Sequence, residues 1–220
     1  TGDLSKRKLL PGLFNLHCAG LMPEEYRVIG VSRRASALSD EEFRQRAHDS
    51  VEARGMRKAS GPEWEEFVQH LSFAAAGQDD PADLVRAVEE AEREIGGEAQ
   101  RLYHLAIPPA AFPGVVAMLG ETGLAERARV IVEKPFGTDL ASAQALNAAV
   151  HAVFGEVDVF RIDHFLGKES IENILALRFA NGLFEPIWNR DHVDHVQIDV
   201  PETLTVAGRS GFYEPTGAFR

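Results

Sequence analysis

Residues 101–133, RLYHLAIPPAAFPGVVAMLGETGLAERARVIVE, place a helical apolar pattern between two short strand-like runs. The runs at 101–106 and 129–133 are apolar and short, as in strands that are buried on both faces of a sheet. The segment 110–119 between them is predicted to be a helix. Two strands joined by one helix indicate a parallel β-α-β unit.

The same alternation of strands and helices extends in both directions from this unit. A strand of buried type is predicted at 26–31, and another at 157–162. We therefore expect an α/β fold with a doubly wound (Rossmann), mostly parallel sheet over residues 1–166. Helices are predicted at 3–20, with a bend at Pro11, and at 39–54, 60–71, 81–95 and 139–153. The helix at 39–54 is expected to open with a capping box between Ser39 and Glu42.

A second domain is expected to begin near Gly167 and to occupy residues 167–220. Its predicted elements are a helix at 167–180 and a strand at 192–200, in which polar and apolar residues alternate. These elements indicate the beginning of an α+β domain. Within the first domain, the run AAAG at 74–77 is interpreted as a loose connector.

The sheet of the first domain is predicted to be incomplete. A doubly wound sheet places its first strand in the middle and follows it with a glycine loop. No strand pattern precedes Gly2 in this sequence. Because loss of a central strand exposes the edges of its neighbours, we expect a trimmed chain that lacks the first strand and the first glycine.

The composition excludes several classes of partner. A formal net charge of -11 over 220 residues argues against nucleic acids and anionic membranes, which bind clustered lysine and arginine. No apolar run is long enough to cross a bilayer, and the start of the sequence lacks the pattern of a signal peptide. The single cysteine, Cys18, cannot form an internal disulfide, which fits a reduced, cytoplasmic location.

The first residues form a candidate phosphate site. Thr1, Gly2, Asp3 and Leu4 lie at the start of a predicted helix. The free amides and the positive dipole end of a helix start suit a phosphate group. On the residues alone, the alternative that Asp3 only caps the helix has equal weight.

A pair of arginines follows the predicted strand at 26–31. Arg33 and Arg34 lie where an NAD enzyme usually carries an acid for the ribose hydroxyl and an NADP enzyme carries an arginine for the 2′-phosphate. The pair therefore favours NADP. The alternative is that both arginines are solvated surface charges.

Two further motifs end predicted strands at the edge where open α/β sheets bind ligands. Pro108 and Pro109 follow the strand at 101–106 and stop it abruptly. Lys134 follows the strand at 129–133 and precedes Pro135, which is a candidate for a cis peptide bond. A lysine at this edge can hold an anionic substrate and stabilise charge in a transition state, although most strand-end lysines only contact solvent.

The segment 161–169, RIDHFLGKE, concentrates ionisable groups between a predicted strand and a predicted helix. Asp163 is suited to orient a histidine that acts as general base. His164 and Lys168 are suited to hold a phosphate group. As bare residues, an adjacent aspartate and histidine are more often structural than catalytic.

Together these motifs resemble the glucose-6-phosphate dehydrogenase family. The resemblance spans nearly the whole chain, and the segment 161–169 matches the family's signature. The other matching stretches are GDLSKRKL at 2–9, the strand that ends at Arg33, IPP at 107–109, EKPFG at 133–137, and Glu202 within VPE at 200–202.

The resemblance implies oxidation of β-D-glucose 6-phosphate to 6-phosphogluconolactone, the entry step of the pentose phosphate pathway. A histidine takes the hydroxyl proton while hydride passes to NADP, and no metal is expected. The NADP-binding residues implied are Thr1, Gly2, Asp3, Leu4, Arg33, Pro108, Pro109 and Lys134. The substrate-binding residues implied are Lys8, Lys134, His164, Phe165, Lys168 and Glu202, and the catalytic residues implied are Asp163 and Lys134.

The sequence departs from the family pattern in two places. The general-base histidine is expected beyond Arg220, so the chain alone is expected to be inactive, and His192 and His195 are interpreted as structural. Phe165 stands where a tyrosine is common, and the lost hydroxyl costs about 0.5–1.5 kcal/mol of phosphate binding if nothing compensates. The full-length protein is expected to be a homodimer or homotetramer.

Two other functions remain open on the sequence. One is a non-catalytic, truncated nucleotide-binding or interaction protein that keeps only the Rossmann half. The other is a dehydrogenase for a different sugar or hexose phosphate, which would keep Arg33 and the glycine loop but change the contacts of Lys168 or Glu202. Strict use of NADP and dual use of NAD and NADP are equally compatible with one arginine.

Overall fold

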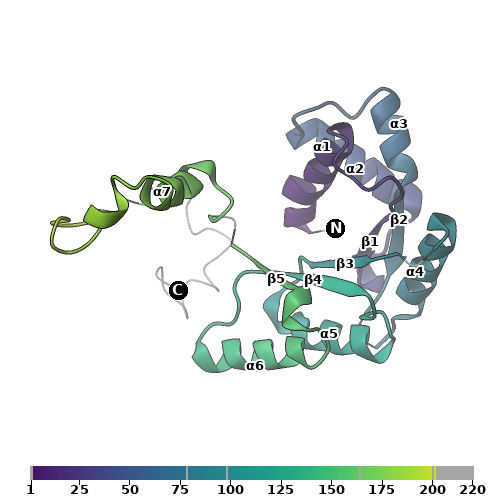
Figure 1. Ribbon diagram of the computed structural model, residues 1–220. Coiled ribbons are helices and arrows are strands. Elements are labelled where there is room, and N and C mark those ends of the chain that lie inside the picture. Colours follow the sequence, from purple (N-terminus) through teal and green to yellow (C-terminus); the bar gives the residue numbers. More distant parts are fainter. Residues whose placement is uncertain (1, 78, 98, 164, 200, 202–220) are drawn as a thin grey trace.

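The structure, a computed structural model, describes residues 2–77, 79–97, 99–163, 165–199 and 201. In this part of the chain, parallel strands alternate with helices (Figure 1). This arrangement confirms the predicted α/β fold class. Among the described helices, none combines the length and the apolar character that a bilayer crossing requires.

The described strands form two small parallel sheets. One pairs β1 (Val28–Ser32) with β2 (Leu71–Ala75), and the other has the order β3-β4-β5. The predicted sheet is therefore divided into two parts, and within the described residues β1 and β3 each pair with one neighbour. The missing first strand stays a prediction. The second sheet consists of β3 (Arg101–Leu105), β4 (Ala128–Glu133) and β5 (Val159–Ile162).

The helices connect the strands and cover the sheets. In Figure 1, α5 and α6 lie side by side next to the β3-β4-β5 sheet, and α4 packs against β1 and β2. The helices from α2 to α6 have the following bounds: Asp40–Arg54 for α2, Pro62–Gln69 for α3, Ala82–Ile95 for α4, Phe112–Glu121 for α5 and Leu140–His151 for α6. Short 3₁₀ helices lie at Arg34–Ser36 (η2), Pro109–Ala111 (η3), Glu156–Asp158 (η4) and Glu185–Ile187 (η5).

The first helical segment changes its geometry ahead of Pro11. A π-helix, η1 (Ser5–Leu9), precedes α1 (Leu10–Cys18), and the amide of Leu10 donates to the carbonyl of Ser5. A proline in an α-helix lacks an amide and clashes with the carbonyl four residues earlier. The wider π turn relieves this conflict. The sequence predicted a bend at Pro11, and the structure has a π-helix just before it.

Two helices begin with reciprocal caps. The Ser39 hydroxyl accepts from the amide of Glu42, and the Glu42 carboxylate accepts from the amide of Ser39, which confirms the predicted capping box at α2. At α6, Asp139 and Ser142 form an equivalent pair. Each cap satisfies amides that the helix itself leaves free.

The prediction for residues 71–75 was wrong. We expected the helix to continue to Leu71 and the alanine run to be a connector, but 71–75 forms β2. Leu71 and Ala74 are buried there, and the strand pairs in register with β1 from Val28–Leu71 to Ser32–Ala75. Tertiary pairing with β1 overrides the weak strand propensity of alanine.

The prediction of a strand at 192–200 was also wrong for the described part of this segment. Residues 192–199 form neither a strand nor a helix. A strand needs a neighbour to accept and donate its backbone hydrogen bonds, and none of the described segments pairs with it. The preceding helix α7 (Glu169–Phe179) has no buried residue and extends away from the two sheets (Figure 1).

The buried apolar side chains form two clusters. The first surrounds β3, β4 and β5 and includes Phe112, Val116 and Val130, each at most 1% exposed. The second lies among α1, α2, α3 and the β1-β2 pair and is centred on Phe14, Phe43 and Phe67. Both clusters hold the strands in the positions from which the candidate site is built.

We predict that Gly30→Ala destabilises the protein. An added Cβ at Gly30 in β1 would lie 2.5 Å from the ring of Phe43, which is 2% exposed and cannot move freely. Overpacking of this kind lowers the free energy of unfolding by about 1–3 kcal/mol, measurable by urea denaturation.

Gly12→Ala is the matched control for this substitution. No atom lies within 4 Å of an added Cβ at Gly12, inside α1. We expect no loss of stability, or a gain of about 0.5–1 kcal/mol from helix propensity. Equal urea midpoints for the two variants would contradict the close packing of β1 on α2.

Candidate functional site

The carboxyl ends of β3, β4 and β5 lie at one edge of their sheet. The strands are parallel, and the register pairs Leu105 with Val132 and Glu133 with Ile162. The segments that leave these strands therefore emerge next to one another. This edge is where open α/β sheets bind ligands.

Lys134 and Asp163 meet at this edge, one after β4 and the other after β5. The Lys134 ammonium lies 3.5 Å from Oδ1 of Asp163, and both side chains are 45% exposed. The same oxygen accepts a hydrogen bond of 3.0 Å from the amide of Phe165, which makes the local turn. The structure thus brings together an acid and a base that are 29 residues apart in sequence.

The ring of Phe165 joins a second lysine to this pair. The Lys168 ammonium lies 3.9 Å from the ring centroid, and the Lys134 ammonium lies 5.4 Å from it. The negative face of an aromatic ring attracts cations, so Phe165 contacts both ammonium groups. Two cations around one ring form a local positive site in an acidic chain.

The loop after β4 turns sharply before α6. The peptide bond between Lys134 and Pro135 is cis, and Gly137 has φ of +99°, a left-handed conformation that other residues rarely adopt. An added Cβ at Gly137 would also lie 2.6 Å from the amide nitrogen of Ala143. Glycine is therefore required for this turn.

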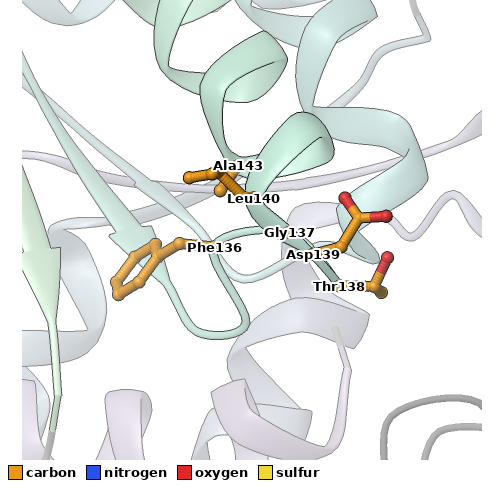
Figure 2. A pocket seen from close by; sticks show the side chains of 6 residues that line it. All are labelled: Phe136, Gly137, Thr138, Asp139, Leu140 and Ala143. Atoms are coloured by element: carbon orange, nitrogen blue, oxygen red, sulfur yellow. The ribbon is translucent and has the colours of Figure 1, made fainter.

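An open hollow of about 450 Å³ lies along the same loop. Figure 2 shows the side chain of Phe136 on one side of the loop, and those of Thr138 and Asp139 on the other. The hollow was not predicted from the sequence. Its lining residues are Phe136, Gly137, Thr138, Asp139, Leu140 and Ala143.

A histidine and a glutamate next to Lys134 form a further pair that the sequence did not reveal. Nε2 of His104 in β3 lies 3.0 Å from Oε1 of Glu133 in β4, and both side chains are about three-quarters buried. Neighbouring strands bring the two residues together, and no sequence spacing could indicate this pairing. The pair links the ends of β3 and β4 beside the site.

Arg161, the first residue of the signature segment, anchors β5 to its surroundings. Its guanidinium donates to both carboxylate oxygens of Glu156 at 2.9 and 3.1 Å, and to Oδ1 of Asn147 in α6 at 2.6 Å. The hydrogen bond from Arg161 lowers the pKa of Glu156 from its ordinary value. These contacts fix the strand that delivers Asp163.

The two arginines after β1 differ in their partners. Arg34 forms ion pairs with Asp80 and with Asp83. Arg33 is exposed, and it forms no ion pair with any residue that the structure describes. Both side chains are exposed, so the two arginines differ in their ion pairs and not in their accessibility.

Other predicted site residues lie elsewhere or outside the described part. Asp3 pairs with Arg7 at 3.4 Å, and Lys8 is exposed without a hydrogen bond or ion pair to the described residues around Lys134. Pro108 is exposed, and its carbonyl accepts from the amide of Ala111 at the 3₁₀ turn that Pro109 begins. Gly2 is exposed and Leu4 half-buried near the start of the first helix, while Thr1, His164 and Glu202 lie outside the described residues.

Parallel strands connected by helices, with charged side chains at their carboxyl edge, define a Rossmann-type domain, the class of fold that binds dinucleotides. The family model for "Glucose-6-phosphate dehydrogenase, NAD binding domain" matches residues 1–173. The model for the C-terminal domain of the same family matches residues 175–220. The chain belongs to the glucose-6-phosphate dehydrogenase family.

Similar proteins agree with this assignment. Glucose-6-phosphate 1-dehydrogenase 2 of Mycobacterium tuberculosis is 42% identical over 228 residues, which cover 100% of this chain and 44% of the relative. Glucose-6-phosphate 1-dehydrogenase of Leuconostoc mesenteroides is 37% identical and is covered to 45%. The chain therefore spans less than half the length of these relatives.

Solved structures also resemble the chain. The crystal structure of glucose-6-phosphate 1-dehydrogenase from Mycobacterium avium superposes with a TM-score of 0.72 at 35% identity, and the match covers 86% of this chain and 40% of that one. A glucose-6-phosphate dehydrogenase in complex with its substrate glucose-6-phosphate gives a TM-score of 0.76 at 38% identity, with the same coverage.

Proposed function

We propose that the full-length protein carrying this chain oxidises D-glucose 6-phosphate to 6-phosphogluconolactone and transfers hydride to NADP. The observation that carries the proposal is the cluster of Lys134, Asp163, Phe165 and Lys168 at the carboxyl edge of the sheet. The similar structure with bound glucose-6-phosphate supports the choice of substrate. A cytoplasmic location and a dimer or tetramer are part of the same proposal.

The two lysines explain how an acidic protein would bind a sugar phosphate. The chain carries a formal net charge of -11, so long-range attraction does not favour a dianionic substrate. Lys134 and Lys168 provide two ammonium groups on one ring, and charge-assisted hydrogen bonds to phosphate are strong. In our proposal Lys168, with His164, holds the phosphate group, and Lys134 lies between substrate and cofactor. Lys8 and Glu202 complete the substrate contacts that we propose.

The chemistry of the donor groups fits NADP. Arg33 presents an exposed guanidinium directly after β1, and guanidinium groups bind phosphate in a bidentate manner. Gly2, Asp3 and Leu4 at the start of the first helix, with Thr1, are proposed to hold the pyrophosphate, and Pro108 and Pro109 to border the nicotinamide. When NADP is bound, its nicotinamide supplies the hydride acceptor.

Asp163 has a positioning role in the proposed reaction. A carboxylate that accepts a hydrogen bond from an imidazole sets the tautomer and stabilises the imidazolium that forms on proton transfer. Lys134 beside Asp163 supplies positive charge near the hydroxyl that loses its proton. We propose that the histidine base lies beyond Arg220, in the part of the family's length that this chain does not span.

The full-length enzyme should produce NADPH from glucose 6-phosphate, as followed by absorbance at the wavelength of the reduced nicotinamide. We expect Lys168→Ala to raise KM for the sugar phosphate more than it lowers kcat, because Lys168 contacts the phosphate and not the reacting carbon. Turnover of other sugar phosphates without turnover of glucose 6-phosphate would overturn the substrate assignment.

The 220-residue chain by itself should show no turnover, because it lacks the proposed general base. The measurement is the same NADPH assay on the isolated chain, with the full-length enzyme at equal concentration as the positive control. Measurable NADPH formation by the isolated chain would contradict the placement of the base beyond Arg220.

Substitutions at Phe165 should separate its two effects on phosphate binding. Phe165→Tyr adds a hydroxyl donor and should lower KM for glucose 6-phosphate by about two- to tenfold, since one hydrogen bond contributes about 0.5–1.5 kcal/mol. Phe165→Leu removes both cation–π contacts and should raise KM by roughly two- to fivefold. Steady-state kinetics of the full-length variants measure both, and a KM that neither substitution changes would contradict the role of the ring.

A further inference from the structure

Of two adjacent arginines after β1, one is held by two carboxylates. Nε of Arg34 contacts Oδ2 of Asp80, and Nη1 of Arg34 lies 3.1 Å from Oδ2 of Asp83. Arg33 has no ion pair within the part of the chain that the structure describes. The two guanidinium groups therefore have different surroundings, although the two residues are adjacent in sequence.

The pairing of β1 with β2 places the acids opposite Arg34. The strands are parallel, Ser32 pairs with Ala75, and the amide of Ala76 donates to the carbonyl of Ser32 at 2.9 Å. The chain leaving β2 thus emerges beside the chain leaving β1. Two backbone hydrogen bonds then link Gly77 with Asp80, just ahead of α4.

The arginine loop is itself well fixed. The amides of Ser36 and Ala37 donate to the carbonyls of Arg33 and Arg34 at 2.9 and 3.0 Å, and the hydroxyl of Ser32 donates to the carbonyl of Ser36 at 2.8 Å. Arg33 has an extended backbone, whereas Arg34 begins the 3₁₀ helix. Both arginine side chains are exposed, and only Arg34 forms ion pairs with the acids that precede and begin α4.

The charges at this position also remain in place at neutral pH. The hydrogen bond from Arg34 lowers the pKa of Asp80 from its ordinary value, so Asp80 stays ionised well below neutral pH. Asp83 is one-quarter exposed and contacts both Arg34 and Arg86. Two carboxylates therefore lie beside the loop that would meet the adenosine end of the cofactor.

We propose that Asp80 and Asp83 withhold Arg34 from the cofactor, so that Arg33 alone contacts the 2′-phosphate of NADP. The proposal rests on the proposed function, because it concerns how this enzyme selects its cofactor. The paired acids neutralise one of two available cations and repel the phosphate group. They keep the preference for NADP over NAD below that of a loop with two free arginines, and Asp80 is a specificity-determining residue.

The test compares cofactor binding by the full-length enzyme and its Asp80→Asn variant without sugar substrate. Dissociation constants for NADPH and NADH are measured by titration of nicotinamide fluorescence. We expect the ratio of the NADH constant to the NADPH constant to rise roughly three- to tenfold. The variant removes a negative charge beside the 2′-phosphate and leaves Arg34 with Asp83 alone, and such half-exposed ion pairs are weak. NADH binding should change little.

Asp79→Asn is the matched control, since it removes the same charge one residue away. Asp79 is exposed and has no ion pair among the described residues. Its ratio should stay within about twofold of the wild type, because a solvent-exposed charge is screened. An unchanged ratio for Asp80→Asn, or an equal rise for both variants, would overturn the proposal.

A charge-neutral double variant tests the same idea without relying on Asp80→Asn alone. In Arg34→Gln with Asp80→Asn, the net charge of the loop is kept, and NADPH should bind within about twofold of the wild type if Arg34 does not contact the cofactor. Weakening by more than about tenfold would identify Arg34 as a phosphate ligand and overturn the proposal.

Arg33→Gln tests the proposed function separately. It should weaken NADPH binding by roughly 10- to 100-fold and leave NADH binding largely unchanged, because a charge-assisted pair with the 2′-phosphate is lost. If Arg33→Gln leaves NADPH binding unchanged, the cofactor assignment itself fails, whatever the Asp80 variants show. The two failures can thus be distinguished.

Discussion

The candidate site depends on the parallel pairing of β3, β4 and β5. Since the strands run in one direction and in register, Lys134 and Asp163 leave the sheet at the same edge, although 29 residues separate them. Buried side chains such as Val130 and Val132 hold this register, because slippage by one residue would turn them to the opposite face. Arg161 and the His104–Glu133 pair then fix the strand ends from either side.

The same constraint acts at the β1-β2 pair with a different result. There the parallel register brings two acids, Asp80 and Asp83, to one arginine, Arg34, and Arg33 keeps its charge without an ion pair to the described residues. At β4 and β5, it brings Asp163 to Lys134, and Lys168 joins them through the ring of Phe165. One geometric rule thus underlies both the site that we propose for the sugar phosphate and the arginine that we propose for the cofactor phosphate.

Much of the fold could be predicted from local pattern. Apolar runs predicted β1, β3, β4 and β5 to within about two residues, and the Ser39–Glu42 spacing predicted the cap of α2. The errors arose where long-range contacts decide the outcome. Residues 71–75 became a strand because β1 provides a partner, and 192–199 stayed irregular because no described segment does. Local propensity contains no information on whether such a partner exists.

The features of the candidate site also fall into those that the sequence predicted and those that only the structure revealed. The sequence by itself determined the family, through the segment 161–169 and the other strand-end motifs, because each is a short run whose residues are adjacent in the chain. The tertiary structure alone decided that Lys134 lies near the ring of Phe165, that Glu133 pairs with His104, and that Arg34 is ion-paired while Arg33 is not paired with a described residue. These facts depend on distances between side chains from different strands and helices, and such distances exist only after the strands have paired.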